Sequence, residues 1–545
     1  MSSTETKQPH GHSNASRSMG SPYDSEKNQP NPKGVAGAIR SALETLPGFG
    51  RESSETKSVV RPALVLMSGR TLAFVFTFLI PVVLVRVFDP AQFGTYKQLF
   101  LVFSTFYGMA PFGIASSLYY FLPSTPQGRG ECVANALLVL ATIGVIGAGA
   151  LVIATPKLVA WFDNPELTAY LPWIGLYALL AMLSSCLEIV LIVQGKYAYA
   201  SASYGLSDVL RAAALILPAL LFRRIGWLLA GAIAVALLRT LFALGFLWRK
   251  FRGSFTPDLP LLKRQLAYSL PFGVAVCVEV LQTGFPQYLV SHRFDPVILA
   301  IFAVGCLENP LVELLGSSAG DVMMVKMQSA LAADRSRVVL ELWHETTAKL
   351  ALLFFPMVAL VAVAAHEIIV LVYTDRYLAS VPILVMWSSM ALLAPFSVDG
   401  VLRVFAQTRI LLILNVVRLT IIVALMPWAL GYGLVAGTFV VVLANAVFKL
   451  AGLLRIKMLL GVSVRELLPW RRLVTFLSMA IVAGAVAWGV RYELPTRAIP
   501  LTLATETALG VLTYGVLVWT LNVLSEREKL ALREAIAKIG ILGIH

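Results

Sequence analysis

The sequence has few charged residues and few cysteines for its length. Only 14% of its 545 residues are Asp, Glu, Lys or Arg, whereas soluble globular proteins average about 25%. Apolar residues make up 58%, which excludes an ordinary soluble fold. The four cysteines, Cys132, Cys186, Cys277 and Cys306, lie within apolar stretches or at their edges without metal-ligand spacing. We interpret them as packing residues and expect neither disulfides nor a metal site.

Several catalytic signatures are also missing. The chain contains no G-x-x-x-x-G-K-[ST] loop and no H-E-x-x-H motif, so ATP-driven transport and zinc hydrolysis are excluded. The loops predicted to lie outside the cytoplasm are too short to form a folded domain. This disfavours a membrane polymerase or ligase that acts on lipid-linked glycans. We therefore predict that the protein is not an enzyme, and no cofactor is implied.

The sequence contains many long apolar runs. A transmembrane helix needs about 20 mostly apolar residues, and fourteen stretches meet this requirement. They cover 63–87, 98–122, 133–154, 170–193, 206–222, 225–247, 266–290, 299–324, 350–372, 381–401, 410–430, 432–454, 473–490 and 501–521. We predict an all-α, polytopic membrane protein.

One tripeptide follows two of these runs and indicates a duplication. Phe88-Asp89-Pro90 closes the first run, and Phe294-Asp295-Pro296 closes the seventh. Internal repeats in a membrane protein commonly form two lobes around a substrate path near the bilayer midplane. We predict two pseudo-symmetric six-helix lobes, 61–250 and 251–458, followed by two further transmembrane helices in 459–524. This organisation is typical of a transporter.

The net charge of +14 reflects membrane topology. Lys and Arg lie mainly in alternate loops, which is the positive-inside pattern and argues against nucleic-acid binding. An even number of spans then places both termini in the cytoplasm. Residues 1–60 are rich in Ser, Gly, Pro and Asn and are predicted to form a disordered cytoplasmic tail. Residues 525–545 are predicted to form an interfacial amphipathic helix.

Charges inside the predicted spans are the candidate functional residues, because each costs at least about 2.5–3.5 kcal/mol to insert. Two pairs, Asp208 with Arg211 and Asp399 with Arg403, are spaced to neutralise themselves within one helix. Arg86 lies near the end of a span, where it can reach the interface. Four other cations have no local partner and are predicted to bind an anionic substrate from both lobes; they are Arg70, Arg239, Arg418 and Lys449. Interhelical pairing, for example with Glu188, is the alternative.

Intramembrane acids form the second set of candidates. They are Glu279, Glu308, Glu313 and Asp321. Such carboxylates can bind a coupling Na⁺, carry a proton or balance the arginines. Glu308 and Glu313 differ by about 140° around a helix, so this helix alone is not expected to form one tight cation site.

Two stretches resemble a known family. The stretch from Val85 through Phe88-Asp89-Pro90 to Tyr96, with Arg70 before it, is similar to the first span and loop of Wzx-type polysaccharide flippases. The stretch 367–384 resembles their junction between the ninth and tenth spans. These proteins belong to the multidrug/oligosaccharidyl-lipid/polysaccharide (MOP) exporter superfamily. Arg70 matches a first-span arginine of the related lipid II flippases.

The resemblance implies that the protein flips undecaprenyl-pyrophosphate-linked oligosaccharide across the bacterial inner membrane. The product would serve O-antigen (lipopolysaccharide), capsule or exopolysaccharide assembly. Implied partners are the lipid-linked oligosaccharide, membrane lipids, and polysaccharide polymerase and export machinery. Two alternatives stay open: a drug/cation antiporter of the same superfamily and a non-transporting scaffold for envelope assembly.

Overall fold

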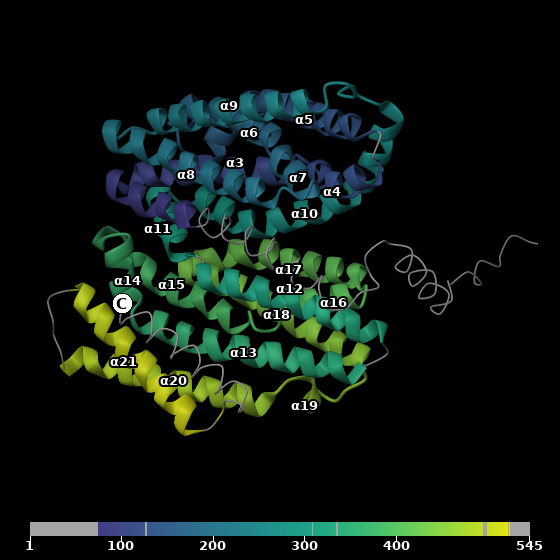
Figure 1. Cartoon of the computed structure of the whole chain (residues 1–545). Coiled ribbons are helices and arrows are strands. Elements are labelled where there is room, and N and C mark those ends of the chain that lie inside the picture. Colours follow the sequence, from purple (N-terminus) through teal and green to yellow (C-terminus); the bar gives the residue numbers. More distant parts are fainter. Residues whose placement is uncertain are drawn as a thin grey trace, which may run out of the picture. The chain divides into compact units, whose positions relative to one another are not determined.

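The computed structural model describes residues 75–125, 128–307, 309–333, 336–493, 499–521 and 523. All of them lie in the larger of two compact units, Val65–His545. The predicted tail, the predicted C-terminal amphipathic helix, Arg70 and Glu308 lie outside the described residues. Throughout the described ranges the regular structure is helical (Figure 1), which confirms the predicted all-α class.

Two groups of helices make up the described unit (Figure 1). The first consists of the apolar helix Val75–Val87, α3 (Pro90–Met109), α4 (Ile114–Ser124), α5 (Arg129–Phe162), α6 (Leu167–Ser184), α7 (Cys186–Val193), α8 (Tyr197–Phe222) and α9 (Ile225–Lys250). The second consists of α11 (Pro296–Gly305), α12 (Pro310–Ala332), α13 (Ser336–Val363), α14 (Ala365–Val372), α15 (Val381–Ser388), α16 (Val398–Val404), α17 (Thr408–Ala429) and α18 (Leu434–Leu460). The short α19 (Val464–Leu467), then α20 (Trp470–Glu493) and α21 (Ile499–Thr520) follow, and α20 packs on α13. The long α10 (Leu259–Arg293) contacts both groups.

Eleven helices in the described ranges are long and apolar enough to cross a membrane, so the protein is a multi-pass membrane protein. Three of the fourteen predicted spans are not among them. The first is described only from Val75 onward. The eighth is divided between α11 and α12, with Pro310 at the start of α12. The tenth is divided into α15, a 3-10 turn and α16. Proline disfavours a helical conformation in the residue before it, which explains the break before Pro310.

Both copies of the repeated tripeptide begin a helix in the same way. Asp89 accepts a 2.8 Å hydrogen bond from the backbone N–H of Gln92 at the start of α3. Asp295 accepts the equivalent 2.8 Å bond from Ile298 at the start of α11. In each helix proline occupies the first turn, where its missing N–H is not needed. The repeat is therefore a pair of equivalent helix caps.

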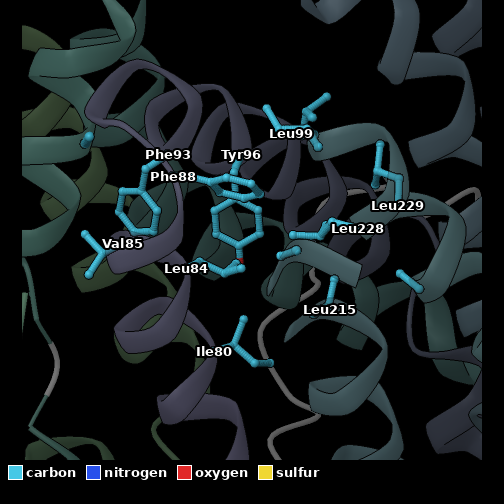
Figure 2. Packing of buried hydrophobic residues seen from close by; sticks show 14 of the residues in the cluster. Ile80, Leu84, Val85, Phe88, Phe93, Tyr96, Leu99, Leu215, Leu228 and Leu229 are labelled. Carbon is cyan, nitrogen blue, oxygen red and sulfur yellow. The ribbon is translucent and has the colours of Figure 1, made fainter. Parts of the chain in front are cut away.

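These two helices, α3 and α11, pack directly against each other. At the contact, a Cβ atom on Gly94 would overlap the carbonyl oxygen of Pro296, so the backbones approach too closely for any other residue. Figure 2 shows the core beside α3, where Leu84, Phe88 and Phe93 are buried against residues of α8 and α9. The repeated caps therefore lie at the junction of the two helix groups.

We call the end of the bundle that carries both Phe-Asp-Pro motifs the FDP end. Further contacts between the groups occur there. The guanidinium of Arg86 donates to the carbonyls of Leu371 and Val372 at the C-terminus of α14, although it is also exposed, as expected for a side chain near the interface. Farther along α3, buried Gln98 donates a 2.8 Å hydrogen bond to buried Ser291 of α10. These bonds hold the first helix group to α14 and to α10 at the FDP end.

Candidate functional site

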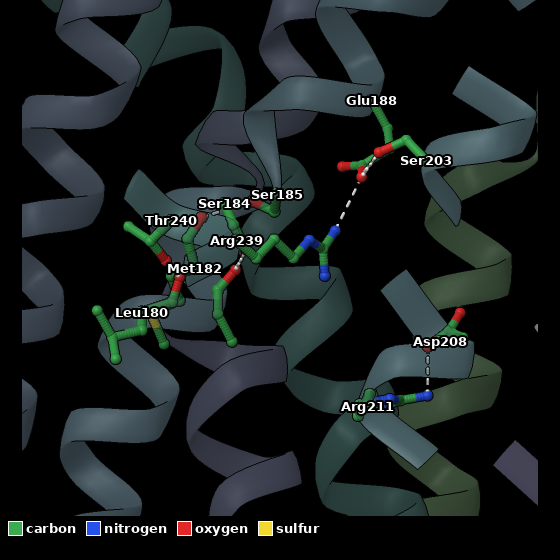
Figure 3. A network of polar contacts seen from close by, with 11 residues as sticks. Leu180, Met182, Ser184, Ser185, Glu188, Ser203, Asp208, Arg211, Arg239 and Thr240 are labelled. Carbon is green, nitrogen blue, oxygen red and sulfur yellow. Dashed lines mark hydrogen bonds and ion pairs between the residues drawn. The ribbon is translucent and has the colours of Figure 1, made fainter. Parts of the chain in front are cut away.

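Arg239 of α9 lies in a polar cluster of the first helix group (Figure 3). Its guanidinium bonds the carboxylate of Glu188 on α7 at 2.9 Å, and the hydroxyl of Ser203 on α8 donates to the same oxygen at 2.7 Å. The Glu188 side chain is 2% exposed, whereas that of Arg239 is 32% exposed. The carboxylate is thus buried and fully dependent on its partners, while the arginine retains an open side. Arg239 is therefore paired with a carboxylate on another helix, which was the alternative to an unpaired cation.

A second ion pair lies within α8 in the same view. Arg211 bonds Asp208 at 2.6 Å, which confirms the pair predicted from the sequence. Arg211 also donates to the hydroxyl of Thr77 at 2.7 Å, linking α8 to the helix Val75–Val87. Both charged side chains are partly exposed, 35% for Arg211 and 24% for Asp208. Arg239 and Arg211, two intramembrane arginines of the first helix group, therefore each lie next to one carboxylate.

Arg418 of α17 has a different environment. Its guanidinium donates to the side-chain oxygens of Gln282 on α10 and Asn445 on α18, the latter at 3.1 Å. The ring of Phe448 lies 5.3 Å from the guanidinium carbon, a cation–π distance. No salt bridge among the described residues includes Arg418. Its positive charge is held by neutral groups, so it retains the capacity to bind an anion.

Gln282 connects this arginine to a neighbouring backbone. Its amide nitrogen donates to the carbonyl of Asn415, one turn before Arg418, at 2.5 Å. Because the other end of the Gln282 amide accepts from Arg418, one side chain joins α10 to α17 at two points. The 3%-exposed Gln282 is thereby fully bonded. This arrangement fixes the position of the guanidinium relative to α10.

Lys449 of α18 lies one residue after Phe448. Its ammonium group donates to the carbonyl of Phe396 at 2.9 Å and bonds Asp399 of α16 at 3.3 Å. The predicted pairing of Asp399 with Arg403 is therefore wrong. The helix that carries Asp399 ends at Val404, and its packing on α18 brings the lysine to the carboxylate in place of the intrahelical arginine. Lys449 is 17% exposed and Asp399 is 42% exposed.

The predicted acidic residues lie apart from these clusters. Glu279, Glu313 and Asp321 are all exposed in the protein, and no salt bridge in the described ranges includes them. Glu313 lines a 330 Å³ cavity together with Phe78, Asn309 and Trp387. Among the described residues, the carboxylates that bond Arg239, Arg211 and Lys449 are Glu188, Asp208 and Asp399. No described group of three or more His, Cys, Asp or Glu side chains could hold a metal ion.

Sequence reasoning missed the neutral members of the Arg418 cluster. Gln282, Asn415 and Asn445 each lie inside a predicted span, and an intramembrane amide needs a hydrogen-bonding partner. The available signal was their spacing, since Asn415 precedes Arg418 by one turn and Asn445 precedes Lys449 by one turn. A search for charged residues inside the spans identified Arg418 and Lys449 but not the neutral amides beside them.

Comparisons with known proteins define the class. The chain matches the solved lipid II flippase MurJ, inward closed conformation, with a TM-score of 0.65 at 11% identity, over 84% of this chain and 98% of that one. It also matches a crystal structure of a MATE mutant with a TM-score of 0.53 at 15% identity, over 75% and 97% of the two chains. A third match is the outward-facing conformation of a multidrug resistance MATE family transporter of the MOP superfamily, with a TM-score of 0.51 at 15% identity and the same coverage.

These matches show that the chain has the fold shared by the MurJ and MATE structures. Residues 83–382 match the family described as "Polysaccharide biosynthesis protein". Since this match covers more than half of the chain, the protein belongs to that family. No curated protein matches the sequence.

Proposed function

We propose that this protein flips undecaprenyl-pyrophosphate-linked oligosaccharide across the bacterial inner membrane by alternating access. The product would supply O-antigen, capsule or exopolysaccharide assembly, with polysaccharide polymerase and export machinery as partners. Family membership supports a role in polysaccharide biosynthesis. The observation that carries the proposal is Arg418, an intramembrane cation held by Gln282, Asn445 and Phe448, with no carboxylate partner in the part of the chain that the structure describes. Such a group suits pyrophosphate, which arginine binds through several donors at once.

The other predicted cations would contribute from both helix groups. Lys449 lies next to Phe448, whose ring is also near Arg418, so the two cations can act on one anionic group. Arg239 has a partly exposed guanidinium and would attract the same group from the first helix group. Arg70 keeps its proposed role on the family resemblance alone. Together these residues would give the substrate path a net positive charge.

Alternating access would move the two lobes, 61–250 and 251–458, against each other, with 459–524 alongside the second. We assign the FDP end to the periplasmic side and both termini to the cytoplasm. The bonds of Arg86 and Gln98 between these two lobes support a closed periplasmic side in this conformation. Glu279, Glu308, Glu313 and Asp321 would couple transport to an ion or balance charge. Substrate would then enter from the cytoplasmic leaflet, where it is made.

The test is flipping of a fluorescent undecaprenyl-pyrophosphate oligosaccharide in proteoliposomes. Arg418→Gln should reduce the flipping rate at least tenfold, since one charge-assisted phosphate contact contributes roughly 1.5–3 kcal/mol. Arg418→Lys, which keeps the charge but loses the planar fork, should retain an intermediate rate. Thermal unfolding of each variant in detergent controls for folding. A folded Arg418→Gln variant with the wild-type rate would overturn the proposal.

A drug/cation antiporter is the second candidate, because three intramembrane carboxylates are exposed and form no salt bridge in the described part of the chain. It predicts proton- or sodium-driven accumulation of a fluorescent organic cation in the same proteoliposomes. That accumulation should disappear in Glu279→Gln or Glu313→Gln. Cation transport without flipping would replace the flippase proposal with the antiporter. Absence of both activities in sealed proteoliposomes that contain folded protein would favour the scaffold.

A further inference from the structure

The outer surface of α9 carries a groove that the transport proposal does not use. It is a 670 Å³ cavity at the C-terminal end of the helix. Leu241, Gly245 and Trp248 lie on one stripe of the helix surface, at positions i, i+4 and i+7. Phe242, Phe246 and Arg249 form the neighbouring stripe. The groove therefore follows the helix axis over about 13 Å, at 1.5 Å per residue.

A glycine opens the floor of this groove. A Cβ atom added to Gly245 would meet no atom within 4 Å. The side chains around it are large and exposed, with Phe242 66% and Trp248 50% exposed. Exposed apolar residues on a membrane-spanning helix face lipid. The apolar half of the groove thus has the open space at Gly245 and the chemistry to hold an acyl chain.

The other half of the groove is basic. Arg249 and Lys250 occupy the last turn of α9, and Lys196 reaches the same cavity from the turn between α7 and α8. The ammonium of Lys250 lies 5.5 Å from the centre of the Phe246 ring. None of the three cations takes part in a salt bridge of the described residues, and no acidic residue lines the cavity. The groove therefore changes from apolar to positively charged along its length.

This polarity matches the order of groups in a phospholipid. The basic end lies at the end of the bundle opposite the FDP end, because α9 begins after a loop on the FDP side and crosses once. Anionic headgroups attract basic residues at a membrane surface, and aromatic rings settle at the same depth. A zwitterionic lipid would fill the apolar half but leave three cations uncompensated. The charge pattern favours an anionic lipid.

We propose that this groove is a binding site for an anionic phospholipid, with the acyl chain along Leu241 and Gly245 and the phosphate at Lys196, Arg249 and Lys250. The site lies on the outside of the first helix group, and Arg239 on the same helix bonds inward to Glu188. Lipid bound there would hold the α7–α8 turn against the end of α9. The proposal is independent of which cargo the protein moves.

Native mass spectrometry of the delipidated full chain tests the site. The protein is given an equimolar mixture of dioleoylphosphatidylglycerol and dioleoylphosphatidylcholine, and the bound lipid is identified by mass. Wild type should retain phosphatidylglycerol preferentially. Lys196→Gln combined with Lys250→Gln should weaken its retention about 25-fold, at roughly fivefold for each cation near the surface. Because the readout is lipid mass, failure of flipping does not affect it.

Two controls distinguish a specific lipid-binding site from general attraction of anionic lipids to basic residues. Arg465→Gln combined with Arg471→Gln removes two cations outside the groove and should leave retention unchanged. Gly245→Leu keeps every charge but fills the floor, and it should reduce retention of both lipids; leucine also favours the helix, so the variant should fold. Equal retention of the two lipids by wild type, equal losses in both charge variants, or an unaffected Gly245→Leu variant would overturn the proposal. Displacement of the lipid by an equal concentration of glycerol 3-phosphate would overturn it too, since the headgroup alone would then be recognised.

Discussion

Glu188 and Arg239 illustrate how single residues inside the membrane divide between structural and functional roles. Removing one partner of a buried ion pair leaves an uncompensated charge and typically costs about 3–5 kcal/mol, whereas replacing both with apolar residues is often neutral. Arg239→Met should therefore destabilise the protein, and Glu188→Met with Arg239→Met should restore stability. Thermal unfolding in detergent measures both.

The same double variant separates the two roles of Arg239. If the arginine also contacts substrate, the stable double variant should still flip at least tenfold more slowly than wild type. Full recovery of both stability and flipping would assign Arg239 to pairing alone. Ser203→Ala, which removes one bond to Glu188 and leaves the charges, serves as the matched control with a small loss of stability.

Residue spacing predicted only the local part of the candidate site. The Asp208–Arg211 pair followed from a separation of three residues on one helix, because such neighbours face the same side. Lys449 and Asp399 lie on two different helices and are fifty residues apart in the chain, so no spacing rule could reveal their pairing. Gln282 and Asn445, which bond Arg418, are also distant from it in the chain. Tertiary packing decides these contacts.

At the scale of helices, the contact of α3 with α11 gives a direct prediction. Gly94→Leu should destabilise the protein by about 1–3 kcal/mol or more, because the new side chain overlaps the backbone at Pro296 and forces the helices apart. Thermal unfolding is the measurement. Gly149→Leu in α5 is the control, since a Cβ there meets no atom within 4 Å, and its stability should match or exceed that of wild type. Equal stability of Gly94→Leu and wild type would contradict the close approach.

The helices themselves were largely predictable. Apolar length located the spans, and the repeated Phe-Asp-Pro correctly indicated two equivalent elements, α3 and α11. Apolar length alone did not reveal the breaks before Pro310 and around Pro395, because the apolar runs continue through both. A broken helix keeps its average hydropathy, so the prolines themselves were the available signal.

At the scale of the whole described unit, alternating access requires the FDP end to open. Gln98 of α3 and Ser291 of α10 belong to the two proposed lobes, 61–250 and 251–458, and are joined by a 2.8 Å hydrogen bond. Gln98→Cys with Ser291→Cys, joined by a short cleavable thiol reagent, should stop flipping, and cleavage should restore it. Cys277 and Cys306 are replaced by alanine beforehand, because both are partly exposed.

A cross-link within one group provides the comparison. Thr95 and Asn164 are bonded at 3.0 Å and both belong to the first helix group, so Thr95→Cys with Asn164→Cys should tolerate the same reagent. Unchanged flipping in the cross-linked Gln98→Cys, Ser291→Cys protein would contradict movement at this end.

The most direct test of the central claim is the time course with which wild-type protein flips fluorescent undecaprenyl-pyrophosphate oligosaccharide in proteoliposomes. We expect the labelled lipid to reach the opposite leaflet faster than in protein-free liposomes, and to do so without ATP. Equal rates with and without protein, together with accumulation of an organic cation by the same vesicles, would contradict the account.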